Sequence, residues 1–166
     1  MTAPSPDPAP APSFWQRRVV GPVKAQLTQG VTPDRLALTF GVGTACSLFP
    51  FLGFTSLLNL GVGIWLRLNQ PILQTLNQLL GPIHLVMIVG YVRLGEWIWR
   101  AQDDRFTIGE MLQTFRDASL GEFLARFGWA GLHAFTAWAL TTPLLIAAVQ
   151  LALRPALRRL AARMRR

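Results

Sequence analysis

The side chains of this sequence that could bind a ligand are a few polar residues set in long apolar stretches, beside residues that interrupt helices. Lipid cannot satisfy the backbone groups freed at such breaks, so broken segments are tolerated only where they are buried in protein or line a cavity. Helix ends at a break could hold a polar or phosphate-bearing headgroup near the middle of a membrane. The candidate substrate path or broken-helix site comprises Pro50, Gly53, Asn59, Arg67, Asn69, Asn77, Gly81, Pro82 and His84.

Catalytic and metal chemistry are poorly supported. No Asp or Glu lies inside an apolar segment, so a carboxylate proton relay is missing. His84 and His133 have no carboxylate or Cys partner that would suggest a metal site, and we expect both to be hydrogen-bonded packing residues. The single Cys46 lies in an apolar stretch and is expected to be a small buried side chain. We therefore expect no enzyme activity, cofactor or metal.

The composition indicates a membrane protein. Hydrophobic residues make up 51% of the chain and charged residues 14%, whereas soluble domains have roughly a quarter charged residues. The ranges 36–66 and 127–153 contain no Asp, Glu, Lys or Arg, and about 20 apolar residues suffice to cross a bilayer. The net charge of +8 comes from Arg residues beside these segments and at the C-terminus, which favours anionic lipid headgroups over nucleic acid.

The break at Pro50 to Gly53 determines how the range 36–66 can lie in a membrane. One unbroken helix would be about 46 Å long, which exceeds the ~30 Å of the hydrocarbon core, and each arm of a broken one would be only about 20 Å. A re-entrant hairpin that enters and leaves on one side satisfies both lengths. The pairs Gly41/Gly43 and Gly61/Gly63 would then meet at one depth, where small residues allow close helix packing.

The remaining organisation follows from local signals. Thr32 and Asn69, each followed within two residues by a proline, predict helix starts. Two capping boxes, Thr107 with Glu110 and Ser119 with Glu122, each predict a short amphipathic helix. Pro143 is expected to kink the last span. We divide the chain into a disordered Pro-rich leader (1–13), an interfacial segment (14–31), a membrane core (32–100), an amphipathic connector (101–126), a transmembrane helix (127–153) and a basic amphipathic tail (154–166).

Charge placement predicts the orientation. Positive residues near spans prefer the cytoplasm, so both the tail and the basic N-terminal part should lie inside. A re-entrant hairpin followed by two crossings, at 72–92 and 127–153, satisfies this rule. The predicted fold is thus all-α and integral to the membrane, with a broken hairpin, two transmembrane helices, amphipathic interfacial helices and a basic C-terminal helix. The residues expected at the membrane surface are Arg154, Arg158, Arg159, Arg163, Arg165 and Arg166.

The run "ALTFGVGTACSLFPFLGFTSLLNLGVGIWLRLN", continued by "LLGPIHL", resembles a bacterial membrane family known as domain of unknown function 2062 over roughly residues 30–100. Pro50, Gly53, Arg67 and Asn69 match its pattern of a Pro-x-x-Gly break and an Arg-x-Asn. Gly81 stands where the family has Asn before Pro82, and Asn77 could substitute for it. The resemblance implies a bacterial inner membrane location and no defined activity, although some members are fused to glycosyltransferases that use lipid-linked sugars.

Two functions remain open from the sequence. The broken segments favour a small transporter or lipid-handling protein for a phosphate-bearing envelope substrate such as a polyprenyl phosphate, working as a homo-oligomer. The absence of charge within the apolar segments favours a non-catalytic scaffold or accessory subunit for an envelope glycosyltransferase. Both hypotheses place the lipid bilayer, with anionic lipid at the basic tail, among the partners, and both expect cytoplasmic termini.

Overall fold

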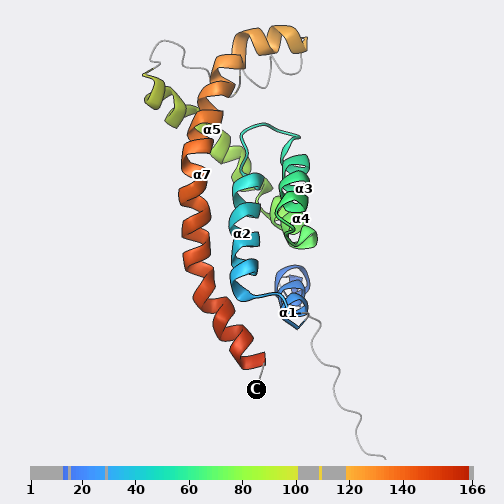
Figure 1. The fold of residues 1–166 in the computed structure, drawn as a ribbon. Helices are drawn as coiled ribbons and strands as arrows, with labels where there is room; N and C mark the ends of the chain where they lie inside the picture. Colours follow the sequence, from blue (N-terminus) through green and yellow to red (C-terminus); the bar gives the residue numbers. More distant parts are fainter. Residues whose placement is uncertain (1–12, 15, 29, 101–108, 110–118, 165–166) are drawn as a thin grey trace, which may run out of the picture.

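The computed structural model describes residues 13–14, 16–28, 30–100, 109 and 119–164, and within these ranges the regular elements are all helices. Figure 1 shows a long helix, α7, with α2 along its side and the C-terminus and α1 at one end of the molecule. The elements are a π-helical turn η1 (Gln16–Val20), α1 (Gly21–Thr28), α2 (Pro33–Ser47), α3 (Thr55–Trp65), α4 (Gln70–Leu79), α5 (Gly81–Trp99) and α7 (Leu120–Met164).

The chain doubles back between α2 and α3, as the break at Pro50 to Gly53 predicts. α2 starts where expected, because Thr32 Oγ1 accepts a hydrogen bond from the Arg35 N–H at 3.3 Å and Pro33 occupies the first turn. In the turn, Pro50 is buried and Gly53 has a φ of 85°, a left-handed conformation that favours glycine. The result is a helical hairpin in which the start of α2 lies beside the end of α3, and we call this end the hairpin mouth.

The range 72–92, which the sequence predicts to cross the membrane as a segment interrupted at Gly81 and Pro82, is not a single helix. It is divided between α4 and α5, whose axes meet at 72° around Leu80. Gly81 and Pro82 are the first residues of α5, so the predicted interruption is confirmed. Proline fits a first helical turn but not the interior of the preceding one, which explains why one helix ends before Pro82.

The C-terminal part is one helix where the sequence predicts separate pieces. α7 continues through Pro143 and Pro155, so the tail is not a separate helix, and the segment after Ser119 is the beginning of α7. The range Gly128–Met164 is the one helix among the described residues that is long and apolar enough to cross a membrane by itself. This length and composition suggest membrane association.

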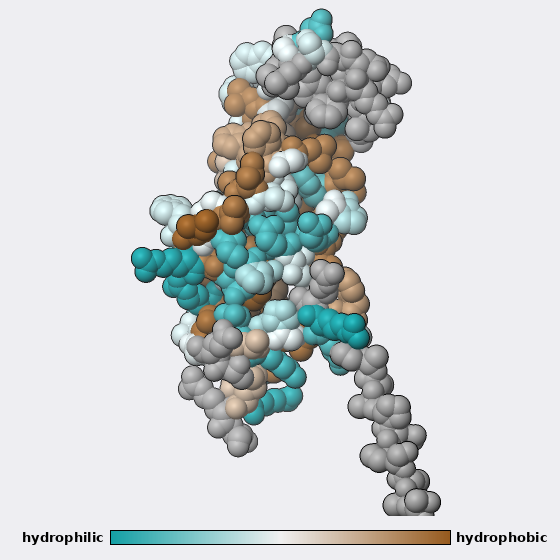
Figure 2. All heavy atoms as spheres, turned by 90° about the vertical axis from the view of Figure 1, so that its right-hand side faces the viewer, coloured by the Kyte–Doolittle hydropathy of each residue, from teal (hydrophilic) through white to brown (hydrophobic). Residues whose placement is uncertain are grey.

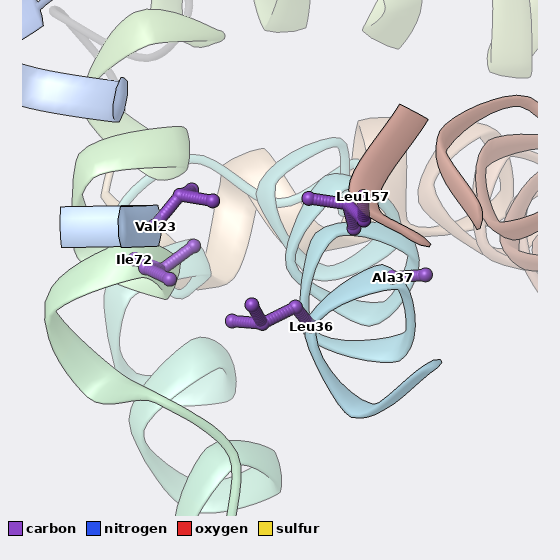
Figure 3. Packing of buried hydrophobic residues seen from close by; sticks show 5 residues of the cluster. All are labelled: Val23, Leu36, Ala37, Ile72 and Leu157. Atoms are coloured by element: carbon purple, nitrogen blue, oxygen red, sulfur yellow. The ribbon is translucent and has the colours of Figure 1, made fainter. Parts of the chain in front are cut away.

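The core is divided into clusters along α7 and α2. At the end near the C-terminus, five buried side chains from α1, α2, α4 and α7 pack together: Val23, Leu36, Ala37, Ile72 and Leu157 (Figure 3). Leu157 and Leu160 belong to the tail (154–166), which the sequence predicts to be a basic amphipathic helix at the membrane surface. The structure instead packs Leu157 and Leu160 onto the protein. This contact anchors the end of α7 to the hairpin.

The sequence predicts that the glycine pairs of α2 and α3 meet, but in the structure they do not face each other. A Cβ atom at Gly43 would lie 2.8 Å from Cδ2 of Leu73, and a Cβ atom at Gly63 would collide with Leu73 Cδ1 as well. Gly41 faces Ile146 of α7, and Gly61 has open space beside it. The glycines therefore admit the Leu73 side chain of α4 between the arms of the hairpin.

Candidate functional site

The break between α2 and α3 is held by side chains from α5 and α7. α2 ends at Ser47, so the carbonyl groups of its last turn lack helical partners. Trp138 Nε1 donates to the carbonyl oxygen of Ala45 at 2.9 Å, and His84 Nε2 lies 2.7 Å from the carbonyl oxygen of Phe49. Because a carbonyl only accepts, His84 donates in this bond. His84 is thus the buried, hydrogen-bonded packing residue that the sequence predicts.

Asn59 joins the two arms at the break. Its side chain has no exposed surface, and Nδ2 donates to Ser47 Oγ at 3.2 Å and to the Thr55 carbonyl oxygen at 3.0 Å. Its Oδ1 atom is buried without a hydrogen-bond partner among the described residues. Such an amide ties the end of α2 to the start of α3 at the cost of one unsatisfied acceptor.

Asn77 and Gln70 connect α4 to α3. Asn77 Nδ2 donates to Ser56 Oγ at 2.8 Å, and Gln70 Nε2 donates to the Leu60 carbonyl oxygen at 3.1 Å. Asn77 therefore lies at the break together with Pro50, Asn59 and His84. Asn69, by contrast, is the cap of α4, because its Oδ1 accepts from the Ile72 N–H at 3.0 Å.

Arg67 lies at the opposite end of α3 from the break. Bonds from Leu68 N–H to Gly63 O at 2.7 Å and from Arg67 N–H to Ile64 O at 3.1 Å end α3 in a Schellman motif. Arg67 occupies the left-handed position of this motif with a φ of 51°, where glycine is the usual residue. The candidate residues thus form two groups: one at the break, and Arg67 with Asn69 at the hairpin mouth.

Arg35 closes the hairpin mouth. One guanidinium nitrogen, Nη2, donates to the carbonyl oxygens of Leu66 and Arg67, each at 3.0 Å. A cation at a helix C-terminus satisfies free carbonyls and interacts favourably with the helix dipole. This role of Arg35 is not among the sequence-based predictions. In a hairpin, however, a basic residue at the start of one arm lies opposite the end of the other arm, and that placement is a signal for such a contact.

The basic tail is partly engaged by the protein. Asp34 pairs with Arg158 at 3.0 Å and with Arg154 at 3.4 Å, which leaves a net positive charge in this cluster. Arg159 and Arg163 are exposed, and their side chains have no ion pair among the described residues. Arg165 and Arg166 lie outside the described residues, as do residues 1–12 of the Pro-rich leader and most of the connector. Of the surface residues expected from the sequence, Arg154 and Arg158 are thus bound to α2.

The turn between α2 and α3 presents apolar side chains. Phe51, Leu52 and Phe54 have exposed fractions of 38%, 56% and 59%. Turns in contact with water favour Gly, Pro, Asn, Asp and Ser, so this turn has a surface suited to an apolar surrounding. No group of three or more metal-ligating side chains occurs in the part of the chain that the structure describes.

The fold and the site define a class of small proteins whose described residues form only helices, with one helix long and apolar enough to span a membrane by itself and a polar cluster at a helix break. The chain belongs to a bacterial family described as "Uncharacterized protein conserved in bacteria (DUF2062)", whose model matches residues 18–166. The match extends beyond the range of about 30–100 on which the sequence resemblance rests, and it includes α7. No curated protein and no solved structure matches the chain.

Proposed function

We propose that this protein is a multi-pass protein of the bacterial cytoplasmic membrane that binds a phosphate-bearing lipid, such as a polyprenyl phosphate, by its headgroup at the mouth of a re-entrant hairpin. The observation that carries the proposal is the conformation of Arg67. A residue other than glycine in the left-handed region costs about 1–2 kcal/mol. Backbone strain of this kind gathers at functional sites, and here it places a guanidinium at the hairpin mouth.

The apolar turn supports the re-entrant topology. The arms of the hairpin are about 16 to 22 Å long, too short to cross ~30 Å of hydrocarbon. Phe51, Leu52 and Phe54 would be poorly placed in water but suit the interior of a bilayer. α4 and α5 then cross as one broken span and α7 returns, so that α1 and the end of α7 share the cytoplasmic face.

The exposed tryptophan residues lie where this topology places the two surfaces of the bilayer. Trp65 is 80% exposed beside Arg67, and Trp97 and Trp129 are 76% and 66% exposed towards the other end of the molecule. Along α7, the distance from Trp129 to Arg154 is about 38 Å at 1.5 Å per residue, close to the full thickness of a bilayer with its interfaces. Amphipathic aromatic rings prefer this interfacial level.

The chemistry at the mouth fits a phosphate. Arg67 is exposed, and its guanidinium makes no hydrogen bond or ion pair within the described residues. A guanidinium binds phosphate oxygens through two parallel hydrogen bonds, which neutral lipids do not offer. Binding would leave the lipid tails beside the apolar outer face of α3.

The internal hydrogen bonds at the break favour a second candidate function. Because the Ala45 and Phe49 carbonyls are bonded to Trp138 and His84, the break serves as a structural joint. A rigid membrane scaffold that docks an envelope glycosyltransferase through Arg159, Arg163 and the anionic lipid around them would need such a joint. This alternative requires no lipid specificity at Arg67.

Replacing Arg67 tests the proposal. Arg67→Gly removes the guanidinium and relieves the left-handed strain, so we expect unchanged or raised thermal stability with about tenfold weaker binding of polyprenyl monophosphate. The matched control is Arg100→Gly, because Arg100 has a φ of 55° at the end of α5, at the other end of the molecule. Binding is measured by native mass spectrometry in detergent, with polyprenol as the ligand that lacks phosphate. Equal binding of the phosphate by wild type and both variants would refute the lipid-binding proposal.

A further inference from the structure

α4 has one apolar and one polar face. Ile72, Leu73 and Leu76 lie on the side that packs into the core clusters with α2. Four amide side chains occupy the other side at helical spacing, and we call this set the amide stripe: Gln70, Gln74, Asn77 and Gln78. The stripe runs from the hairpin mouth at Asn69 to the break.

One edge of the amide stripe is bonded to α3, and the other is open. Asn77 and Gln70 donate to Ser56 and to the Leu60 carbonyl, whereas Gln78 is exposed and Gln74 is partly exposed. Gln70 Oε1 is buried with no hydrogen-bond partner in the described part of the chain. The amide groups that the stripe can offer to a ligand are therefore those of Gln74 and Gln78, which make no hydrogen bond within the described residues.

The neighbouring face of α3 has the opposite character. Leu57, Ile64 and Trp65 are exposed by 64%, 63% and 80%, in the helix to which Asn77 and Gln70 are bonded. Figure 2, which views the molecule from the side of α1, α3 and α4, shows hydrophilic residues across the middle and hydrophobic residues above them. Lipid suits the α3 face but leaves amide groups at the same depth without partners.

We propose that the amide stripe is a hydrated slot for a lipid headgroup, running from Arg67 at the hairpin mouth to the helix break in the middle of the bilayer. This inference rests on the lipid binding proposed for Arg67 and adds the path that the bound headgroup takes. Amides bind phosphate and hydroxyl groups by hydrogen bonds without fixing them through charge, so a headgroup held at Arg67 can exchange along them. The lipid tails remain beside the apolar face of α3.

The slot has a consequence for movement between leaflets. Its length, from Gln70 to Leu80, is about 15 Å at 1.5 Å per residue, or roughly half of the hydrocarbon core. A headgroup at the break has only the remaining half to cross. The described residues place no carboxylate in the slot, so this movement would run down a gradient of lipid without coupling to protons.

Thiol accessibility tests the slot in the reconstituted full-length protein. In a Cys46→Ala background, Gln74→Cys and Gln78→Cys place thiols in the stripe, and Leu57→Cys and Leu60→Cys place matched thiols on the exposed face of α3. A membrane-impermeant maleimide needs a hydrated thiolate, so we expect the stripe thiols to react about tenfold faster than the α3 thiols when the reagent is added at the basic face. A permeant maleimide measures the total thiol.

Ligand protection then identifies the occupant. We expect polyprenyl monophosphate to slow labelling of Gln74→Cys, while polyprenol and inorganic phosphate leave it unchanged. Stripe thiols that are as unreactive as the α3 thiols would overturn the proposal, and so would a disulfide between two copies at Gln74→Cys, which would make the stripe a contact with a second copy. Labelling that only inorganic phosphate slows would also overturn it. The binding measurement on Arg67→Gly is a separate test. If Arg67→Gly binds the lipid normally while the stripe thiols react quickly, the role proposed for Arg67 is refuted and the hydrated slot is not.

Discussion

Arg35 donates from its guanidinium to the carbonyl oxygen of Arg67, 32 positions later in the chain, at 3.0 Å. This bond and a second one to the carbonyl oxygen of Leu66 join the first turn of α2 to the two residues that follow α3. They also satisfy carbonyls that the end of α3 leaves free. The two ends of the hairpin are therefore held at one level, which is the geometric requirement of a segment that enters and leaves a membrane on one side.

Removing Arg35 should weaken the hairpin without abolishing the fold. We expect Arg35→Ala to lower the free energy of unfolding by about 1 kcal/mol, because the lost bonds are exposed and water can replace them. Denaturation in detergent, followed by circular dichroism, measures this. Arg159→Ala is the control, since Arg159 is exposed with no ion pair among the described residues. An equal effect of both substitutions would contradict the role of Arg35.

Two glycines of α5 should respond to alanine in opposite ways. A Cβ atom at Gly95 would collide with the backbone of His133 in α7, so Gly95→Ala must separate the helices and should cost about 1–3 kcal/mol. Gly90 has open space, and Gly90→Ala should stabilise the protein by about 0.5–1 kcal/mol. Thermal unfolding of the two variants separates these outcomes. A neutral Gly95→Ala would show that α5 and α7 do not pack as closely as described.

The bond from Trp138 to Ala45 should fix the break to α7. Trp138→Phe removes the Nε1 donor and retains an aromatic ring near Phe49, whose centroid lies 4.9 Å from that of Trp138. The carbonyl of Ala45 is then left without this partner, and we expect a loss of about 1–3 kcal/mol in stability. Trp97→Phe, at an exposed position, should change stability little. Comparable losses for the two variants would argue against the joint.

The start of α7 should depend on pH through its capping box. The N–H and hydroxyl of Ser119 both donate to the Glu122 carboxylate, at 2.9 and 2.8 Å, and these bonds lower the pKa of Glu122. Since the folded pKa is depressed, the contribution of this carboxylate is complete above the unfolded pKa of about 4.3 and is lost as the pH falls through the lower, folded value. Carbon-13 NMR titration should show a midpoint for Glu122 below its ordinary value. Ser119→Ala should raise that midpoint, and an unchanged midpoint would exclude the cap.

The sequence predicts the local features of this fold well. Helix starts at Thr32 and Asn69, the Ser119–Glu122 capping box and both breaks depend on neighbouring residues, and the structure confirms each of them. The hairpin follows from lengths that the breaks impose. These features are readable because caps and prolines act within a few residues.

Contacts between distant elements could not be predicted in the same way. The glycines of α2 could equally face α3, α4 or α7, and which helix they admit depends on the packing of Leu73 and Ile146. The continuity of α7 through Pro143 and Pro155 overrides a local rule. The burial of Leu157 against α1, α2 and α4 stabilises the helix after Pro155. The pairing of Arg154 and Arg158 with Asp34 likewise requires knowing that the ends of α2 and α7 meet.

Sidedness of three single cysteines tests the re-entrant hairpin most directly. In a Cys46→Ala background, Asp34→Cys, Arg67→Cys and Gly128→Cys each place a thiol at an exposed position in the structure. An impermeant maleimide applied to right-side-out and inverted membrane vesicles should label positions 34 and 67 from the cytoplasmic side and position 128 from the other side. Labelling of positions 34 and 67 from opposite sides would mean that the range 36–66 crosses the membrane, and it would contradict the account.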